Sequence, residues 1–146
     1  MNEMQLKLMA CSENELFARN TVAAFALPLN PSLSELSDIK TAVSEAVTNC
    51  IVHGYAGREN GWITIVCRIE GDTLHIRISD SGKGIANVQE ALTPFYTTLS
   101  GEERSGMGFT IMQTFMSSFA VESKVGAGTT VSMTKDFGVR AEADAG

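Results

Sequence analysis

The feature that most constrains this sequence is a long apolar stripe with helical spacing, which begins near Ser32 or Ser34 and runs to about His53. Its members recur at steps of three, four and one residues, and they are Leu36, Ile39, Val43, Val47, Cys50 and Ile51. This spacing places them on one side of an α-helix. Gly54 and Gly57 follow as helix-ending residues. The pattern predicts an amphipathic helix that covers another apolar surface.

The rest of the chain predicts strands and two further helices. Alternating polar and apolar residues predict strands over 5–10, 62–69, 73–79, 120–125 and 129–135, and helical spacing predicts helices that start at Ser12 and span 108–119. Ser12 and Glu15 have the spacing of a capping box at the first of these helices. Turns at 70–72 and 126–128 join consecutive strands.

Composition limits the class of partner. The 146 residues are 44% apolar and 19% charged, which suits one domain, expected over 1–136 with a frayed tail over 137–146. The formal net charge is −6 and the basic residues are scattered, which argues against direct nucleic-acid binding. No stretch approaches the roughly 18 apolar residues of a membrane span, so we expect a cytoplasmic protein without membrane contact. The cysteines Cys11, Cys50 and Cys67 form no CxxC pair, which disfavours a zinc site or a disulfide framework.

Two polar residues lie on the far side of the long helix. With Leu36 at zero and about 100° per residue, Glu45 falls at about 180° and Asn49 at about 220°, opposite the apolar stripe. His53, one turn further along, borders the same side. The solvated side of an amphipathic helix also carries such residues, so the pair alone does not define a site.

Two glycine-rich segments could approach a ligand closely with their backbone. Residues 80–84 run Asp-Ser-Gly-Lys-Gly after a predicted strand, where an ordinary polar turn has similar composition. Residues 104–108 run Arg-Ser-Gly-Met-Gly before a predicted helix, where amides and an arginine could hold phosphate oxygens, or where the chain could simply enter the helix flexibly. The polar stretch from Pro94 to Met107 has no clean period and predicts a mobile lid.

Familiar phosphate-binding patterns are absent from the sequence. It contains no P-loop motif, and after Gly106 and Gly108 the third Rossmann position is Ile111 rather than Gly or Ala. It has neither the H-R-D tripeptide nor the glycine loop and strand lysine of protein kinases. A phosphate site in this chain therefore needs another design.

Taken in order, the motifs resemble those of the ATPase superfamily that contains gyrase B, the Hsp90 chaperone, histidine kinases and MutL. Residues 44–49 resemble its helical N-box, 80–84 its first glycine box, 106–108 its second, and 126–130 a third element. The resemblance covers nearly the whole chain. Residues 43–49, 53–55 and 104–112 look most like the small anti-sigma serine kinases of sporulating bacteria.

That resemblance implies an α+β fold, a Bergerat-type two-layer α/β sandwich with a mostly antiparallel sheet and helices on one face. It implies ATP or ADP and Mg²⁺ as cofactors. The partners it implies are a sigma factor of the sigma F type, an anti-anti-sigma substrate and a second copy of the chain in a homodimer. The implied activity is inhibition of a sporulation sigma factor together with serine phosphorylation of the anti-anti-sigma protein. It assigns Glu45 and Arg104 to catalysis, Asn49 to Mg²⁺ and nucleotide, Asp80, Gly82, Gly84, Ser105, Gly106, Met107, Gly108, Thr129 and Thr130 to the nucleotide, and Glu15 and Arg19 to partners.

Several of these roles have a direct physical rationale. A buried Asp80 carboxylate that accepts from the adenine amino group would disfavour guanine, which presents an acceptor there. Glu45 would orient or deprotonate the attacking serine hydroxyl, while Mg²⁺ on Asn49 and the charge of Arg104 would neutralise the γ-phosphate. Lys83 is expected to be a solvated loop charge.

Other interpretations stay open at this point. The chain could be a general-stress type of anti-sigma kinase, or an ATP-dependent sigma-binding switch without kinase activity. A histidine-kinase catalytic domain would need a dimerisation helix with a phosphoacceptor histidine, for which the 30 residues before the long helix leave no space. A metabolic domain with coincidental glycine loops is the remaining alternative.

Overall fold

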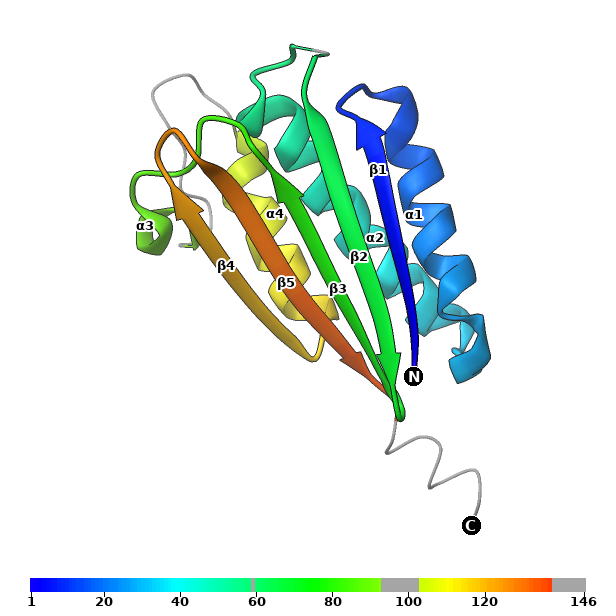
Figure 1. The fold of residues 1–146 in the computed structure, drawn as a ribbon. Coiled ribbons are helices and arrows are strands. Elements are labelled where there is room, and N and C mark those ends of the chain that lie inside the picture. Colours follow the sequence, from blue (N-terminus) through cyan, green and yellow to red (C-terminus); the bar gives the residue numbers. More distant parts are fainter. Residues whose placement is uncertain (59, 93–102, 138–146) are drawn as a thin grey trace.

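The computed structural model describes residues 1–58, 60–92 and 103–137. Within these residues, five antiparallel strands form one sheet in the order β1-β2-β3-β5-β4, and α1, α2 and α4 lie on one of its faces (Figure 1). The strands are β1 (Asn2–Met9), β2 (Trp62–Glu70), β3 (Thr73–Asp80), β4 (Ser118–Lys124) and β5 (Gly128–Asp136), and the helices are α1 (Glu13–Phe25), η1 (Leu27–Leu29), α2 (Leu33–Asn49), the π-helical turn η2 (Cys50–Gly54), α3 (Val88–Leu92) and α4 (Glu103–Phe115). The predicted α+β fold with helices on one face is confirmed.

The hydrophobic core lies between the sheet and its helices. Every second residue of β3 is buried, namely Leu74, Ile76 and Ile78, and these side chains face the helices. The predicted stripe of α2 meets them, since Ile39 and Val43 have no exposed surface. Burying one such side chain contributes about 1.5–3 kcal/mol, so this alternation fixes which side of each strand faces the helix layer.

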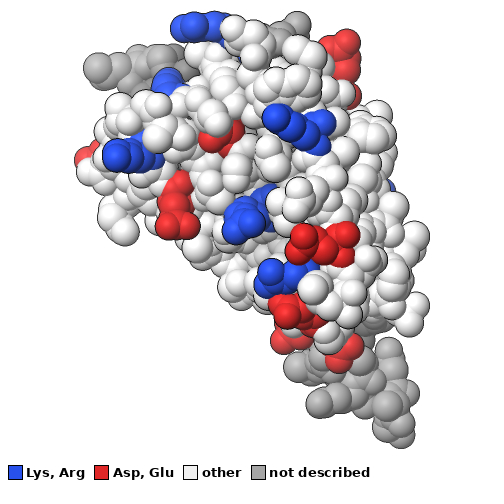
Figure 2. All heavy atoms as spheres, viewed as in Figure 1, with Lys and Arg blue, Asp and Glu red and all other residues white. Residues whose placement is uncertain are grey.

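The opposite face of the sheet is polar and carries charges of both signs. In Figure 2 the Lys and Arg side chains alternate with Asp and Glu over this face, and neither sign forms a continuous area there. Arg68 and Glu70, for example, form an ion pair with 2.9 Å between Nη2 and Oε1. Charges of the two signs are therefore interspersed on this visible face.

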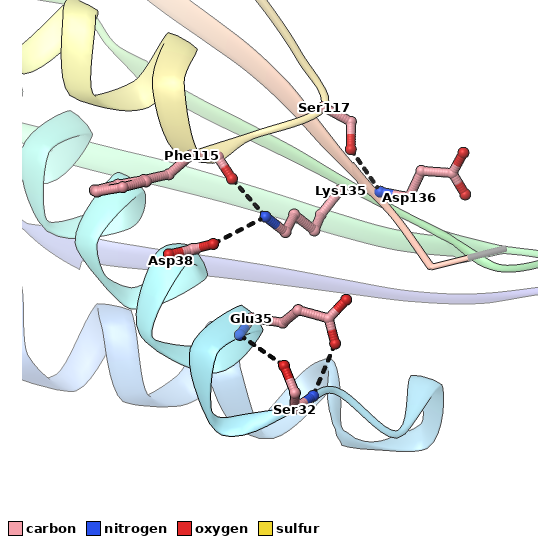
Figure 3. A network of polar contacts seen from close by, with 7 residues as sticks. All are labelled: Ser32, Glu35, Asp38, Phe115, Ser117, Lys135 and Asp136. Atoms are coloured by element: carbon pink, nitrogen blue, oxygen red, sulfur yellow. Dashed lines mark hydrogen bonds and ion pairs between the residues drawn. The ribbon is translucent and has the colours of Figure 1, made fainter. Parts of the chain in front are cut away.

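The capping box lies at a different helix from the one predicted. The Glu35 N–H donates to Ser32 Oγ at 3.1 Å, and the Ser32 N–H donates to Glu35 Oε1 at 2.8 Å, at the start of α2 (Figure 3). Ser12 has helical backbone angles, with φ −58° and ψ −33°, so its side chain makes no capping bond. The Glu15 carboxylate instead accepts a hydrogen bond from the Ser44 hydroxyl at 2.7 Å. The predicted Ser12–Glu15 box is therefore wrong, because Glu15 is used between helices.

Helix α4 begins five residues earlier than predicted and ends four residues earlier (108–119 predicted). Residues 118 and 119 belong to β4 instead, where Phe119 pairs with Met133 of β5. Glycine in a helix interior costs about 1 kcal/mol, but Phe109 and Met112 are buried and hold this helix against the core. Of the predicted lid, 103–107 are therefore helical, and 94–102 lie outside the described residues.

A half-buried lysine of β5 connects the end of α4 to α2. The Lys135 ammonium donates to the Phe115 carbonyl at 2.5 Å and to Asp38 Oδ2 at 3.2 Å (Figure 3). A cation at a helix C-terminus satisfies an orphan carbonyl and opposes the helix dipole. This contact holds the C-terminal end of α4, which is the end away from Gly106 and Gly108.

The C-terminal boundary of the folded part lies beyond the predicted one. Phe137 is 1% exposed and belongs to the hydrophobic core, and its N–H donates to the Asp72 carbonyl at 2.9 Å. The predicted tail therefore does not start at Phe137. Residues 138–146 lie outside the described residues.

Candidate functional site

A cavity of about 300 Å³ opens where α2 passes into η2, beside the end of β3 and the adjoining helices. Its size is at the lower end of ligand pockets. Much of its lining is apolar, and its polar lining residues include Asp80 and Asn49. The lining residues are Ala46, Asn49, Cys50, His53, Gly54, Ile78, Asp80, Lys83, Gly84, Ile85, Ala86, Asn87, Glu90, Ala91, Phe109, Thr129 and Val131.

The part of the cavity around Asp80 is here called the base end. This carboxylate stands at the last position of β3 and is 9% exposed. Its Oδ1 accepts the Gly82 N–H at 2.8 Å, and the Cys50 thiol lies close to the same carboxylate. Burial, and secondly the charge of Asp80, raise the pKa of the Cys50 thiol well above its usual range, so the thiol stays protonated at neutral pH.

Gly82 is required by the protein's own backbone. A Cβ at this position would overlap the Gly54 carbonyl oxygen, which accepts the Lys83 N–H at 2.8 Å. The sequence predicted that Gly82 and Gly84 leave room for the base. At Gly82 the structure shows another need for glycine, because η2 packs directly against the backbone there. Gly84 and Lys83 line the cavity, and the Lys83 side chain is exposed.

The part of the cavity beside Asn49, where α2 meets α4, is here called the amide end. A Cβ added at Gly108 would lie 3.2 Å from Asn49 Nδ2 and 3.3 Å from Glu45 Oε2. Glu45 and Asn49 therefore face α4 at the point where Gly108 has no side chain. The predicted shared face is real, but α4 covers it, so its polar groups are not simply solvated.

The Asn49 amide is buried, and neither Oδ1 nor Nδ2 has a hydrogen-bond partner within the described residues. Such groups are rare in native proteins and often mark a site for an ion or a ligand. A carboxamide oxygen is a suitable Mg²⁺ ligand, and Mg²⁺ is commonly held by one or two side chains, substrate phosphates and waters.

The predicted phosphate-binding segment lies in the first two turns of α4. The backbones of Arg104, Ser105 and Gly106 are helical, and Met107 and Gly108 continue the same helix. The first four N–H groups of an α-helix have no partner inside the helix. Any amides that bind an anion here are therefore those at the start of α4, and the loop predicted before Gly108 is wrong.

The two predicted threonines face opposite sides of the sheet. Thr129 pairs with Asp80 across β3 and β5 and lines the cavity. Thr130 is the partner of Ser79, with 3.1 Å between the two hydroxyl oxygens on the outer face. Thr130 therefore points away from the cavity, because adjacent strand residues point to opposite faces.

The predicted partner residues lie outside the cavity, in a groove of about 510 Å³ between α1 and α2. Arg19 Nε is 3.5 Å from Glu15 Oε2, and Ser44 joins the pair through its hydrogen bond to Glu15. Glu45 lines this groove next to Ser44, and the same side chain approaches Gly108 at the amide end. Glu45 therefore connects the groove with the amide end of the cavity.

Sequence reasoning missed the short helix α3 and the tyrosine beside η2. Glu90 and Ala91 of α3 line the cavity, and the Glu90 N–H donates to Asn87 Oδ1 at 3.1 Å. Asparagine followed three residues later by glutamate is a helix-start signal that could have revealed α3. Tyr55 carries no such signal, because its contacts depend on the tertiary fold.

The fold and the site are those of a nucleotide-binding ATPase domain. The family described as "Histidine kinase-like ATPase domain" matches residues 13–135, and the chain belongs to this family. It is 54% identical over 137 residues to "Anti-sigma F factor" of Thermoanaerobacter pseudethanolicus, a match that covers 94% of this chain and 95% of the relative. It is 56% identical over 134 residues to "Anti-sigma F factor" of Anoxybacillus flavithermus, covering 92% of each.

Solved structures agree on the fold. The RsbU and RsbW domains of Rv1364c from Mycobacterium tuberculosis match with a TM-score of 0.67 at 19% identity, over 93% of this chain and 32% of that one. The catalytic domain of histidine kinase ThkA matches with a TM-score of 0.57 at 16% identity, over 93% and 96%. In the described part of the chain, no helix is long and apolar enough to cross a membrane.

Proposed function

We propose that this protein is a cytoplasmic anti-sigma factor that inhibits a sporulation sigma factor of the sigma F type and phosphorylates an anti-anti-sigma protein on serine with Mg-ATP. The observation that carries the proposal is the buried Asn49 amide beside Glu45, at one end of a cavity whose other end holds Asp80. The high identity to relatives called anti-sigma F factors over nearly their whole length supports the same function.

In this proposal ATP binds with its base against Asp80 and its phosphates toward Asn49. The carboxylate accepts from the adenine amino group, and the apolar walls formed by Ile78, Ile85 and Val131 pack against the ring. Asn49 holds Mg²⁺ through its carboxamide oxygen. Arg104 and the amides at the start of α4 bind the terminal phosphate oxygens.

Glu45 acts on the acceptor serine. Its carboxylate lies where the α1–α2 groove meets the amide end of the cavity, so a hydroxyl that enters from the groove reaches Glu45 before the phosphates. Glu45 accepts the hydroxyl proton as the serine oxygen attacks the γ-phosphorus, and ADP leaves. When bound, Mg²⁺ supplies charge neutralisation between the phosphates.

The groove between α1 and α2 serves as the surface for protein partners. Arg19 is held by Glu15, which in turn accepts the Ser44 hydroxyl, so the guanidinium is placed at the groove next to Glu45. An acidic segment of the sigma factor or of the substrate protein pairs with Arg19. Arg19→Glu is expected to weaken binding of one or both partners, and unchanged binding of both would contradict this role. We further propose that the protein acts as a homodimer, as the resemblance implies.

The decisive experiment mixes the protein with γ-labelled Mg-ATP and a family anti-anti-sigma protein, followed by phosphoamino-acid analysis. We expect labelled phosphoserine with the wild type and a transfer rate at least about 100-fold lower with Glu45→Gln, since a general base contributes 10²–10⁴-fold. Glu45→Gln keeps the side-chain size, and its ATP affinity should be nearly unchanged. ATP-dependent sigma binding without any phosphoserine would overturn the kinase assignment in favour of a switch.

A further inference from the structure

We propose that Tyr55, together with η2, is a positioning device that holds Asp80 for base recognition without Tyr55 itself lining the cavity. The inference rests on the proposed ATP-binding function and extends it to the origin of base specificity. Tyr55 is half-buried, and its hydroxyl makes two hydrogen bonds to main-chain groups on either side of the base end. Cys50 and Gly54 belong to η2, and they contact the same segment, residues 80–83, which is called the loop below.

The π-helical turn determines where these groups point. The Tyr55 N–H donates to the Cys50 carbonyl at 3.0 Å, a spacing of five residues rather than the four of an α-helix. One extra residue in the turn rotates everything that follows it relative to α2. Single π-helical turns recur at functional sites for this reason. Here the turn lets Cys50 reach Asp80 while Gly54 and Tyr55 reach the residues after it.

Three contacts from this turn act on consecutive parts of the loop. The Cys50 thiol lies beside the Asp80 carboxylate, the Tyr55 hydroxyl accepts the Ser81 N–H at 2.7 Å, and the Gly54 carbonyl accepts the Lys83 N–H at 2.8 Å. The side chain of Asp80 and the peptide groups that follow it are thus fixed by groups outside the loop. Such support is what keeps a recognition group in its productive orientation.

The Tyr55 hydroxyl is itself fixed in direction. It donates its one proton to the Trp62 carbonyl at 2.6 Å, so its lone pairs are left for the Ser81 N–H. This joins the start of β2 to the end of β3, next to the pairing of Ile63 with Asp80. A Cβ on Gly61 would overlap the Tyr55 ring, which shows how closely the chain packs on it. Tyr55→Phe removes both hydrogen bonds and keeps the ring.

The consequence concerns which base the site accepts. A carboxylate held in one orientation favours a purine with an exocyclic amino group and disfavours one with a carbonyl at the same position. Inosine triphosphate differs from ATP only along that edge of the base, where a carbonyl replaces the amino group and N1 carries a proton. When Ser81 loses its acceptor, Asp80 gains freedom to turn, and the preference for ATP over inosine triphosphate should fall.

The test measures the dissociation constants of Mg-ATP and Mg-inosine triphosphate by calorimetry for wild type, Tyr55→Phe and the control Ser118→Ala. Ser118→Ala also removes one hydroxyl hydrogen bond, but at the outer face of β4. We expect the ATP preference to fall about tenfold in Tyr55→Phe, equivalent to losing roughly one hydrogen bond, and to stay unchanged in the control. An unchanged preference, or an equal weakening of both nucleotides, would overturn the inference.

Two further outcomes separate this inference from its basis. A wild type that binds neither nucleotide overturns the proposed function and the inference with it, whereas a discriminating wild type whose preference survives Tyr55→Phe overturns the inference alone. If Tyr55→Phe does not fold, Cys50→Ala and Cys50→Ser replace it. Serine keeps a donor for Asp80 and should retain the ATP preference, while alanine should reduce it, and equal preferences in the two variants would refute the role of η2.

Discussion

The base end and the amide end of the cavity are built in opposite ways. At the base end, the Asp80 carboxylate and the N–H groups of Ser81 and Lys83 all have partners within the protein. At the amide end, Asn49 is buried under α4, and its amide has no partner within the described residues. An unsatisfied buried polar group costs about 1–3 kcal/mol. The polar groups at the base end therefore have their hydrogen-bond partners within the protein, whereas the Asn49 amide does not.

This difference teaches how the two ends divide the proposed work. A group that is already fixed loses little freedom on binding and can select one base by its orientation. A buried polar group that gains its partner only when the ligand binds makes the stability of the folded protein depend on that ligand. Changes at the base end should therefore affect selectivity, whereas changes at the amide end should move stability and ligand affinity in opposite directions.

The largest expected effect is that of Asp80→Asn. The substitution keeps the size and an acceptor oxygen for Gly82 and Cys50, but it places an NH₂ group in place of one carboxylate oxygen. We expect Mg-ATP affinity to fall at least about 100-fold, or roughly 3 kcal/mol, as measured by calorimetry. Far-ultraviolet circular dichroism should match the wild type. A variant that binds ATP within threefold of the wild type would break the assignment of the base end.

A second prediction concerns a region remote from both ends. Lys135→Met removes the ammonium that donates to the Phe115 carbonyl and to Asp38. Because Lys135 is only 14% exposed, we expect a loss of about 2 kcal/mol in the free energy of unfolding in urea. ATP affinity should stay within twofold. Combining it with Asp38→Asn should cost less than the sum of the single changes, and full additivity would show that the pair does not interact.

Asn49→Leu tests the amide end directly, through effects of opposite sign. Leucine has a similar volume and no unsatisfied polar atom, so the nucleotide-free protein should gain about 1 kcal/mol in the free energy of unfolding. Mg-ATP affinity should fall at least about tenfold. Urea unfolding and calorimetry measure the two effects. A destabilised variant with wild-type Mg-ATP affinity would show that Asn49 is an ordinary structural residue.

The smallest effect is a pH dependence that belongs to the sheet rather than to either end. Burial raises the pKa of the Cys67 thiol from 9.0 to about 12, so the folded state holds this proton more tightly than the unfolded state. The resulting stabilisation is fully present below pH 9 and is lost as the pH rises from 9 to 12. Between pH 9 and 10, the free energy of unfolding should fall by about 1 kcal/mol more in wild type than in Cys67→Ala. Parallel pH profiles would contradict this.

The parts of the site that could be predicted are those fixed by a repeating pattern. The helical period placed Glu45 and Asn49 on one side of α2, and strand alternation placed Asp80 at the end of β3. Thr129 and Thr130 could not be distinguished in this way, because the register that decides which one faces the cavity depends on pairing with β3. The sheet class was implied by the family resemblance, and the predicted order of helices and strands agreed with it.

The parts that could not be predicted depend on tertiary contacts. Glycine composition favoured a loop before Gly108, but packing of α4 on α2 makes that segment helical and uses Gly108 for close approach to Asn49. Glu15 has the spacing of a capping residue, yet its carboxylate accepts a hydrogen bond from Ser44 of α2 instead. The π-helical turn η2 has no local sequence signal, because it is stabilised by contacts with residues far away in the sequence. One of them is the hydrogen bond from the Lys83 N–H to the Gly54 carbonyl.

The most direct test of this account is the affinity of the wild type for ATP and for adenosine, measured by calorimetry with Mg²⁺ and with a chelator. If the amide end works through the metal and the base end does not, Mg²⁺ should strengthen ATP binding at least about tenfold and leave adenosine binding unchanged. ATP binding of equal strength in the two conditions, or adenosine binding that needs Mg²⁺, would contradict the division between the two ends of the cavity.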